Sequence, residues 1–118
     1  MSGNSIYTIE ELPDYLFINL KRVKNVKHLS HDFHYSEKIN LRQFLPKEYK
    51  KSTNYQLIGV LKHHGSGKGG HKTAVCKHLN LNIWRVFNDD IPISNADEYD
   101  IFKGEANILL YEIIKDNN

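Results

Sequence analysis

Residues 63–71 read HHGSGKGGH, and residues 84–89, beyond an extended segment, read WRVFND. A histidine after paired glycines, followed by an amide and a carboxylate behind two aromatic residues, is typical of one half of a catalytic site. His71 can take up a proton, and Asn88 or Asp89 can orient its ring through the second ring nitrogen. Nothing in the chain resembles the nucleophile that such a histidine would serve, so the pattern predicts half of a site.

Apolar runs on both sides of these two stretches predict strands rather than helices. Leu16, Ile18 and Leu20 alternate with other residues, and Tyr55–His63 and Asn107–Ile114 read as buried strands. In all we expect about six strands, over residues 16–20, 55–63, 71–78, 83–88, 91–94 and 107–114, with a short candidate strand near Phe33–Ile39. The turn signals between them favour antiparallel pairing.

A single short helix is expected over Ala96–Phe102, capped by Ser94 or Asn95, with Asp97 and Glu98 in its first turn. The fold class is therefore α+β, dominated by an antiparallel sheet. The last strand is strongly apolar and should lie inside the sheet. One short helix cannot cover the apolar face of such a sheet, which indicates a missing partner segment.

The composition bounds the class of protein. A length of 118 residues suggests one domain, which we place at residues 12–114, with a disordered start over 1–11 and a tail over 115–118. No apolar run approaches the roughly 20 residues that span a bilayer, and we expect no membrane association. Cys76 is the single cysteine, so it forms no internal disulfide, and a cytoplasmic or nuclear location is the default.

Charge is spread unevenly along the chain. Residues 21–88 hold 14 basic and 3 acidic residues, whereas the two ends hold 2 basic and 11 acidic residues. A basic middle can attract an anionic partner, although a solvated basic surface is the simpler interpretation. No RNA-binding motif supports the first interpretation, so nucleic acid is not an expected partner.

Five ordered boxes resemble the C-terminal half of a ubiquitin-specific protease, a papain-like family of cysteine proteases. The boxes carry the opening LP and LKR pattern, the strand and turn before the histidine, the GGH box, the WxxFND box and the closing strand. The matching residues are Leu12-Pro13 with Leu20-Lys21-Arg22, Tyr55 to Gly65, Gly69 to Thr73, Trp84 to Asp89, and Ala106 to Tyr111. They span about residues 12–113 in the family's order.

The resemblance implies a papain-like half-domain in which His71 is the general base, Asn88 orients it and Asp89 is the adjacent carboxylate. It implies that Gly69, Gly70 and His64 contact the substrate, because glycines allow close approach of the narrow Gly-Gly tail of ubiquitin. Neighbouring strand residues face opposite ways, so only one of Asn88 and Asp89 should reach His71. The implied reaction is thiol-dependent hydrolysis of ubiquitin conjugates.

Two departures from the family pattern shape this expectation. Lys72 stands where the family has a tyrosine, and the family's N-terminal cysteine box, the source of the nucleophile, is absent from these residues. Alone, the chain is not expected to be active, and a cysteine-box segment becomes an expected partner beside ubiquitin. The alternative is a non-catalytic module that binds ubiquitin or another protein through the retained sheet.

The remaining candidate groups give weaker signals. Cys76 lies five residues after His71 on the same expected strand, so it should face the opposite side and act as a buried structural cysteine. His28, His31 and His34 recur every three residues but have no fourth ligand nearby. We therefore expect neither a metal nor a cofactor.

Overall fold

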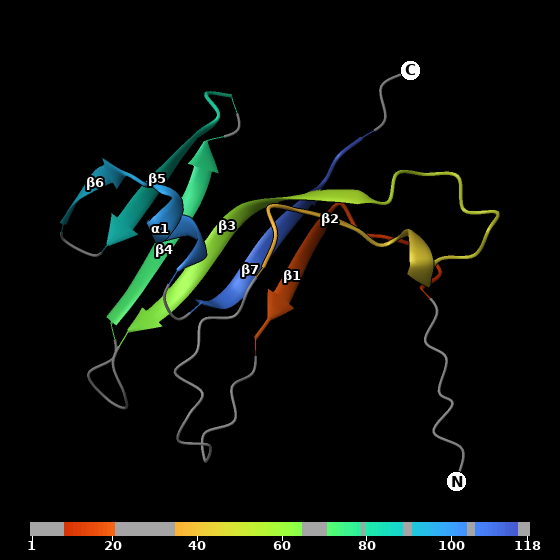
Figure 1. Cartoon of the computed structure of the whole chain (residues 1–118), viewed down its shortest axis with the longest axis horizontal. Coiled ribbons are helices and arrows are strands. Elements are labelled where there is room, and N and C mark those ends of the chain that lie inside the picture. The colour runs from red at the N-terminus through yellow and green to blue at the C-terminus, as the bar shows by residue number, and fades with distance from the viewer. Residues whose placement is uncertain are drawn as a thin grey trace, which may run out of the picture.

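The computed structural model describes residues 9–20, 35–64, 71–78, 80–88, 91–103 and 106–115. These residues form a seven-stranded sheet with one short α-helix lying over it (Figure 1). The strands are β1 Tyr15–Asn19, β2 Lys38–Asn40, β3 Asn54–His64, β4 His71–His78, β5 Ile83–Asn88, β6 Ile91–Asn95 and β7 Ala106–Ile113. The helices are the 3-10 helix η1, Arg42–Phe44, and the α-helix α1, Glu98–Phe102.

All strand pairs are antiparallel, and the order across the sheet is β1-β7-β3-β4-β5-β6. The long strand β3 pairs with β7 on one side. On its other side it pairs first with β2 and then, nearer its end, with β4. The closing strand β7 lies between β1 and β3, which confirms the expectation that the apolar terminal strand is internal.

The core lies on one face of the sheet, beneath α1. It comprises the buried residues Tyr55, Leu57, Val60, Val75, Ile101, Ala106, Leu109 and Tyr111. The two tyrosines bury their rings and satisfy their hydroxyl groups on backbone carbonyls. Tyr55 donates to Pro13 at 2.6 Å, and Tyr111 donates to Ser36 at 2.6 Å. These bonds tie the segments before β1 and β2 to the sheet.

Helix α1 begins later than the sequence suggested, and its cap is Asp97 rather than Ser94 or Asn95. The Asp97 carboxylate accepts from the Asp100 backbone N–H at 2.9 Å, and the Asp100 carboxylate accepts from the Asp97 N–H at 3.0 Å. The expected cap was wrong because β6 continues through Asn95, which pairs with Arg85 of β5. Pairing with β5 keeps the backbone extended through Asn95, so the helix can begin only after that residue.

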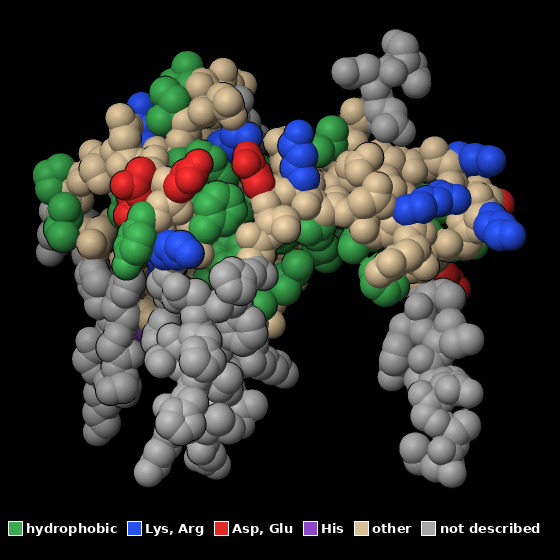
Figure 2. Space-filling model, viewed as in Figure 1, with side chains coloured by type: hydrophobic (Ala, Val, Ile, Leu, Met, Phe, Trp, Pro, Cys, Tyr) green, Lys and Arg blue, Asp and Glu red, His purple; other side chains and the backbone are tan. Residues whose placement is uncertain are grey.

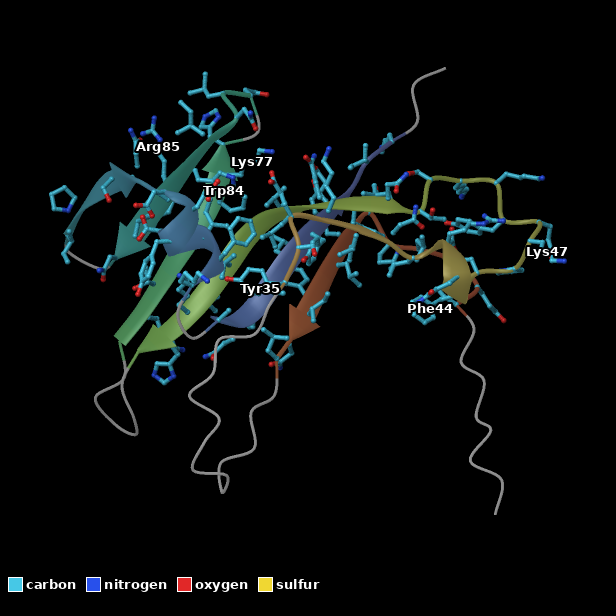
Figure 3. All side chains as sticks on the ribbon, viewed as in Figure 1. Tyr35, Phe44, Lys47, Lys77, Trp84 and Arg85 are labelled. Atoms are coloured by element: carbon cyan, nitrogen blue, oxygen red, sulfur yellow. The ribbon has the colours of Figure 1, made fainter. Side chains whose placement is uncertain are left out.

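A buried lysine anchors α1 to the sheet. Lys62 of β3 is 5% exposed, and its Nζ donates to the backbone carbonyls of Asp100 and Lys103. A cation at the C-terminal end of a helix satisfies carbonyls that have no partner within the helix. Tyr35, labelled in Figure 3, adds a second tie through its hydroxyl on the Ile101 carbonyl and a ring contact of 5.7 Å with Phe102.

The other sequence expectations have mixed outcomes. The candidate strand near residues 33–39 is β2 at Lys38–Asn40, which makes seven strands rather than about six. The chain turns after Pro46, where the Tyr49 N–H donates to the Pro46 carbonyl at 3.1 Å. The predictions for residues 1–8, 28, 31 and 34 lie outside the described residues. In the described part of the chain, no helix is both long and apolar enough to cross a membrane.

Acidic and basic side chains gather at different places on the α1 face of the molecule (Figure 2). Acidic side chains gather over α1, whose first turn holds Glu98 and Asp100, and basic side chains gather at the end of the sheet formed by the η1 segment. Lys47, labelled in Figure 3, lies at that far end. The described part of the basic middle is therefore split between the η1 end and the β4–β5 end.

Candidate functional site

The candidate site lies where β3 ends, β4 begins and β5 ends. His71 is the first residue of β4, and its backbone pairs with His64, the last residue of β3. On the other side of β4, Ala74 pairs with Phe87 of β5. Asn88 follows Phe87 as the last residue of β5. The sheet thus brings the described parts of the two sequence boxes, residues 63–71 and 84–89, onto adjacent strands at one end.

Asn88 is half-buried, and its Oδ1 is a fully buried atom without a hydrogen-bond partner among the described residues. A buried polar atom that lacks a partner costs about 1–3 kcal/mol. Buried polar groups in native proteins are nearly always paired, so an exception of this kind needs an explanation. An amide oxygen held in this way is ready to accept a hydrogen bond from a donor at the end of the sheet.

A pocket of about 310 Å³ opens beside Asn88. Its lining comes from four strands, β3 to β6, and comprises Leu61, Lys72, Thr73, Ala74, Phe87, Asn88, Ile91 and Ile93. Lys72, at the position where the family pattern has tyrosine, is exposed and pairs with His63 of β3. The pocket is therefore mostly apolar, with one cation and one amide at its edge.

The remaining residues of the predicted site are described in part or not at all. For His71 and His64 the structure gives the strand positions, as above. Gly69, Gly70 and Asp89 lie outside the described residues. The expectation that only one of Asn88 and Asp89 reaches His71 accordingly stays a prediction.

Cys76 is exposed, so the expectation of a buried structural cysteine was wrong. It lies on the face of the sheet opposite to Thr73 and Val75, and that face has no covering layer among the described residues. Neighbouring atoms still bury part of the thiol, and this desolvation raises the pKa of Cys76 above its ordinary value. A nucleophilic cysteine needs a lowered pKa, so Cys76 lacks the property that the missing nucleophile requires.

Sequence reasoning missed Lys62, and it named Thr73 only as part of the GGH box. Lys62 pairs with Thr73 across β3 and β4, and both side chains are buried. A signal was present, because Lys62 is the one charged residue within the apolar run YQLIGVL-K. Such a charge in a central strand indicates a buried cation with backbone partners.

The described residues contain no group of three or more His, Cys, Asp or Glu side chains that could hold a metal ion. His63 and His78, the two histidines whose side chains are described, lie at opposite ends of the β3–β4 hairpin.

Comparison with known proteins identifies the class. The family model described as ubiquitin carboxyl-terminal hydrolase matches residues 3–111, and the chain belongs to this family. The chain is 33% identical over 117 residues to the ubiquitin carboxyl-terminal hydrolase Usp2 of Drosophila melanogaster. That match covers 90% of this chain and 12% of the Drosophila protein.

Solved structures of the Ubp8-containing deubiquitinating (DUB) module of SAGA have the same fold. The yeast module has a TM-score of 0.76 at 27% identity, over 93% of this chain and 27% of that chain. The Ubp8/Sgf11/Sus1/Sgf73 module bound to ubiquitin aldehyde has a TM-score of 0.76 at 26% identity, over 93% of this chain and 26% of that chain. The chain thus spans about a quarter of these solved relatives and a smaller part of Usp2.

Proposed function

We propose that this chain is the histidine- and asparagine-bearing half of a deubiquitinating cysteine protease, with a papain-like arrangement of its site. The single observation that carries the proposal is the buried, unpartnered Oδ1 of Asn88, on the strand beside the one that His71 begins. Family membership gives the chemistry, because the neighbours include ubiquitin-bound deubiquitinating modules.

In the proposed reaction, a cysteine thiol from a second segment gives its proton to the His71 imidazole. The resulting thiolate attacks the carbonyl carbon of a ubiquitin conjugate, and the imidazolium then protonates the departing amine. His71 next removes a proton from the water that hydrolyses the thioester. Asn88 accepts a hydrogen bond from the second ring nitrogen of His71, which fixes the tautomer and the plane of the ring.

Asn88 supplies orientation without a charge. An amide oxygen holds the ring as a carboxylate would, yet it adds no negative charge to stabilise the imidazolium. Asp89, the neighbouring carboxylate, is proposed to support the site. Gly69, Gly70 and His64 are proposed to border the channel for the ubiquitin tail, and the proposed location is the cytosol or nucleus.

The test is complementation in trans. The chain is mixed with a cysteine-box segment, and release of a fluorophore from the C-terminus of ubiquitin is followed. Cleavage should appear only with both parts, and His71→Ala should abolish it. Asn88→Asp should retain cleavage, whereas Asn88→Leu should lower kcat about 10²- to 10⁴-fold, the range expected when a catalytic histidine loses its orienting partner.

Two results would contradict the proposal. Full cleavage by the His71→Ala chain would show that His71 is not the general base. Ubiquitin binding by the chain without any cleavage in the presence of the cysteine-box segment would instead favour a non-catalytic ubiquitin-binding module.

A further inference from the structure

Strands β5 and β6 do not pair residue for residue, because β6 contains one extra residue near Asn88. Val86 pairs with Ser94, and Asn88 pairs with Ile91. One residue separates these two pairs on β5, whereas two residues separate them on β6. This irregularity is a β-bulge, a feature that is common next to active sites, where it redirects a side chain.

The extra residue of β6 lies at a position that suits proline. Proline has no backbone N–H to give to a sheet ladder, so it is confined to edge strands, strand starts and bulges. Strand β6 is the outermost strand of the sheet (Figure 1), and Pro92 lies within the bulge. If β6 kept the register of the pair Val86 and Ser94, Pro92 would lie opposite Asn88. The bulge places Ile91 there instead.

The bulge also determines the face to which Ile91 points. Residues two apart on a strand share a face, so Asn88 faces the α1 side with Val86, which packs against the core. Paired residues of an antiparallel ladder also share a face, with Cβ atoms about 4.5–5.5 Å apart. Ile91 therefore lies beside Asn88 on the α1 side. In an unbroken register with Ser94, the Ile91 side chain would point to the opposite face.

Ile91 is an apolar neighbour of a buried polar atom. Among the described residues that line the pocket, it is the apolar one that shares the face of Asn88, because strand pairing and alternation put the others on the opposite face. Those others are Leu61, Ala74, Phe87 and Ile93. Ile91 is 57% exposed, whereas the Oδ1 atom of Asn88 is fully buried. The outer part of Ile91 thus meets solvent while the amide oxygen beside it does not.

We infer that Ile91 is a positioning residue for the general base. It covers the Asn88 amide oxygen, excludes water from it and so reserves it for the His71 ring. A hydrogen bond is stronger where water is excluded and the local dielectric constant is low. This inference rests on the proposed function and adds the residue that maintains the hydrogen bond from His71 to Asn88.

Valine and threonine at position 91 provide a matched pair of variants. Both are β-branched and of similar shape, and they differ by a hydroxyl group in place of a methyl group. In the chain alone, NMR measures the ¹³C shift of the Asn88 side-chain carbonyl, which moves to higher frequency when the oxygen accepts a hydrogen bond. Ile91→Val should leave this shift unchanged. Ile91→Thr should raise it, because the hydroxyl or the water that it admits donates to the oxygen.

The complementation assay with the cysteine-box segment tests the effect on the reaction. Ile91→Thr should lower kcat about tenfold, less than loss of the orienting partner itself, and leave KM unchanged. Ile91→Val should retain the natural kcat. Leu81→Thr is the control, because Leu81 is 54% exposed in the turn between β4 and β5, and it should change neither kcat nor the Asn88 shift. If Ile91→Thr loses its circular dichroism spectrum, Ile91→Ala replaces it.

Failure of this inference and failure of the proposed function give different results. Absence of cleavage by the natural chain with the cysteine-box segment would reject the proposed function, and with it any role of Ile91 in catalysis. Cleavage by the natural chain with an unchanged Asn88 shift in Ile91→Thr would overturn the positioning role alone. So would a natural kcat in Ile91→Thr, with or without a raised KM.

Discussion

Replacing Asn88 by leucine should leave the isolated chain as stable as before, or make it more stable. The two side chains have similar shapes, and leucine removes the buried Oδ1 that has no partner among the described residues. Loss of an unsatisfied buried group recovers its desolvation cost, about 1–3 kcal/mol for a fully buried atom. Asn88 as a whole is only half-buried, so we expect the lower end, a gain of 0 to about 1 kcal/mol in the free energy of unfolding.

Asn40 in β2 offers a matched control, because its amide is fully used. Its Oδ1 accepts from the Arg42 backbone N–H at 2.7 Å and from the Thr53 hydroxyl at 3.1 Å, and its Nδ2 donates to Asn54 at 2.7 Å. Net hydrogen bonds contribute about 0.5–1.5 kcal/mol each, and exposed ones contribute least. Asn40→Leu should therefore lower the free energy of unfolding by about 1–2 kcal/mol.

Urea unfolding followed by fluorescence measures both effects, because Trp84 is the single tryptophan and packs against the core. If the free energy of unfolding falls equally steeply with urea concentration in the natural chain and both variants, the substitutions change only stability. The reasoning is refuted if Asn88→Leu lowers the free energy of unfolding by more than about 1 kcal/mol, the contribution of one satisfied hydrogen bond. In that case Asn88 is a structural residue rather than one kept for a site.

Other substitutions and pH test the ties that hold the sheet and α1. Lys62→Met should lower the free energy of unfolding by about 1–3 kcal/mol, because two carbonyls of the α1 segment lose their donor. Thermal melts of the natural chain and of Lys62→Met measure this loss. Tyr111→Phe removes one hydroxyl bond to Ser36 and should cost about 1 kcal/mol in urea unfolding. The hydrogen bond from the Asp100 backbone N–H lowers the pKa of Asp97. A lowered folded-state pKa gives stability above the ordinary carboxyl pKa and loses it as the pH falls through the lowered value. Acid titration of Asp97→Asn, followed by circular dichroism, should lack that component of the acid-induced loss, and an unchanged acid profile would contradict this origin.

Much of the sheet could be predicted because its strands are locally marked. The run at residues 107–114 is apolar on both faces, which only an internal strand explains. In the structure this run forms most of β7, which lies between β1 and β3. The hydrophobic pattern also indicated β5 at its observed bounds, and β3 with a difference of one residue at each end. The start of α1 was missed because pairing of Asn95 with Arg85, a long-range effect, decides where the strand ends.

The residue types and their order in the chain predicted which residues belong to the site, but not their surroundings. Sequence boxes named Asn88, but the unpartnered state of its oxygen depends on which side chains surround it in three dimensions. Burial of Cys76 was predicted wrongly for a related reason. Its strand looks central in the sequence, yet the face on which Cys76 lies has no cover among the described residues.

The central claim is that the Asn88 amide oxygen accepts a hydrogen bond from the His71 ring once the cysteine-box segment has joined the chain, and the imidazole nitrogen spectrum measures this directly. Long-range ¹H–¹⁵N NMR of the chain bound to the cysteine-box segment, assigned with His71→Ala, reports which ring nitrogen carries the proton. We expect one dominant tautomer for His71 in the natural chain and in Asn88→Asp, and a mixture typical of free histidine in Asn88→Leu. Identical His71 spectra in the natural chain and Asn88→Leu would show that the two residues do not interact and would contradict the account.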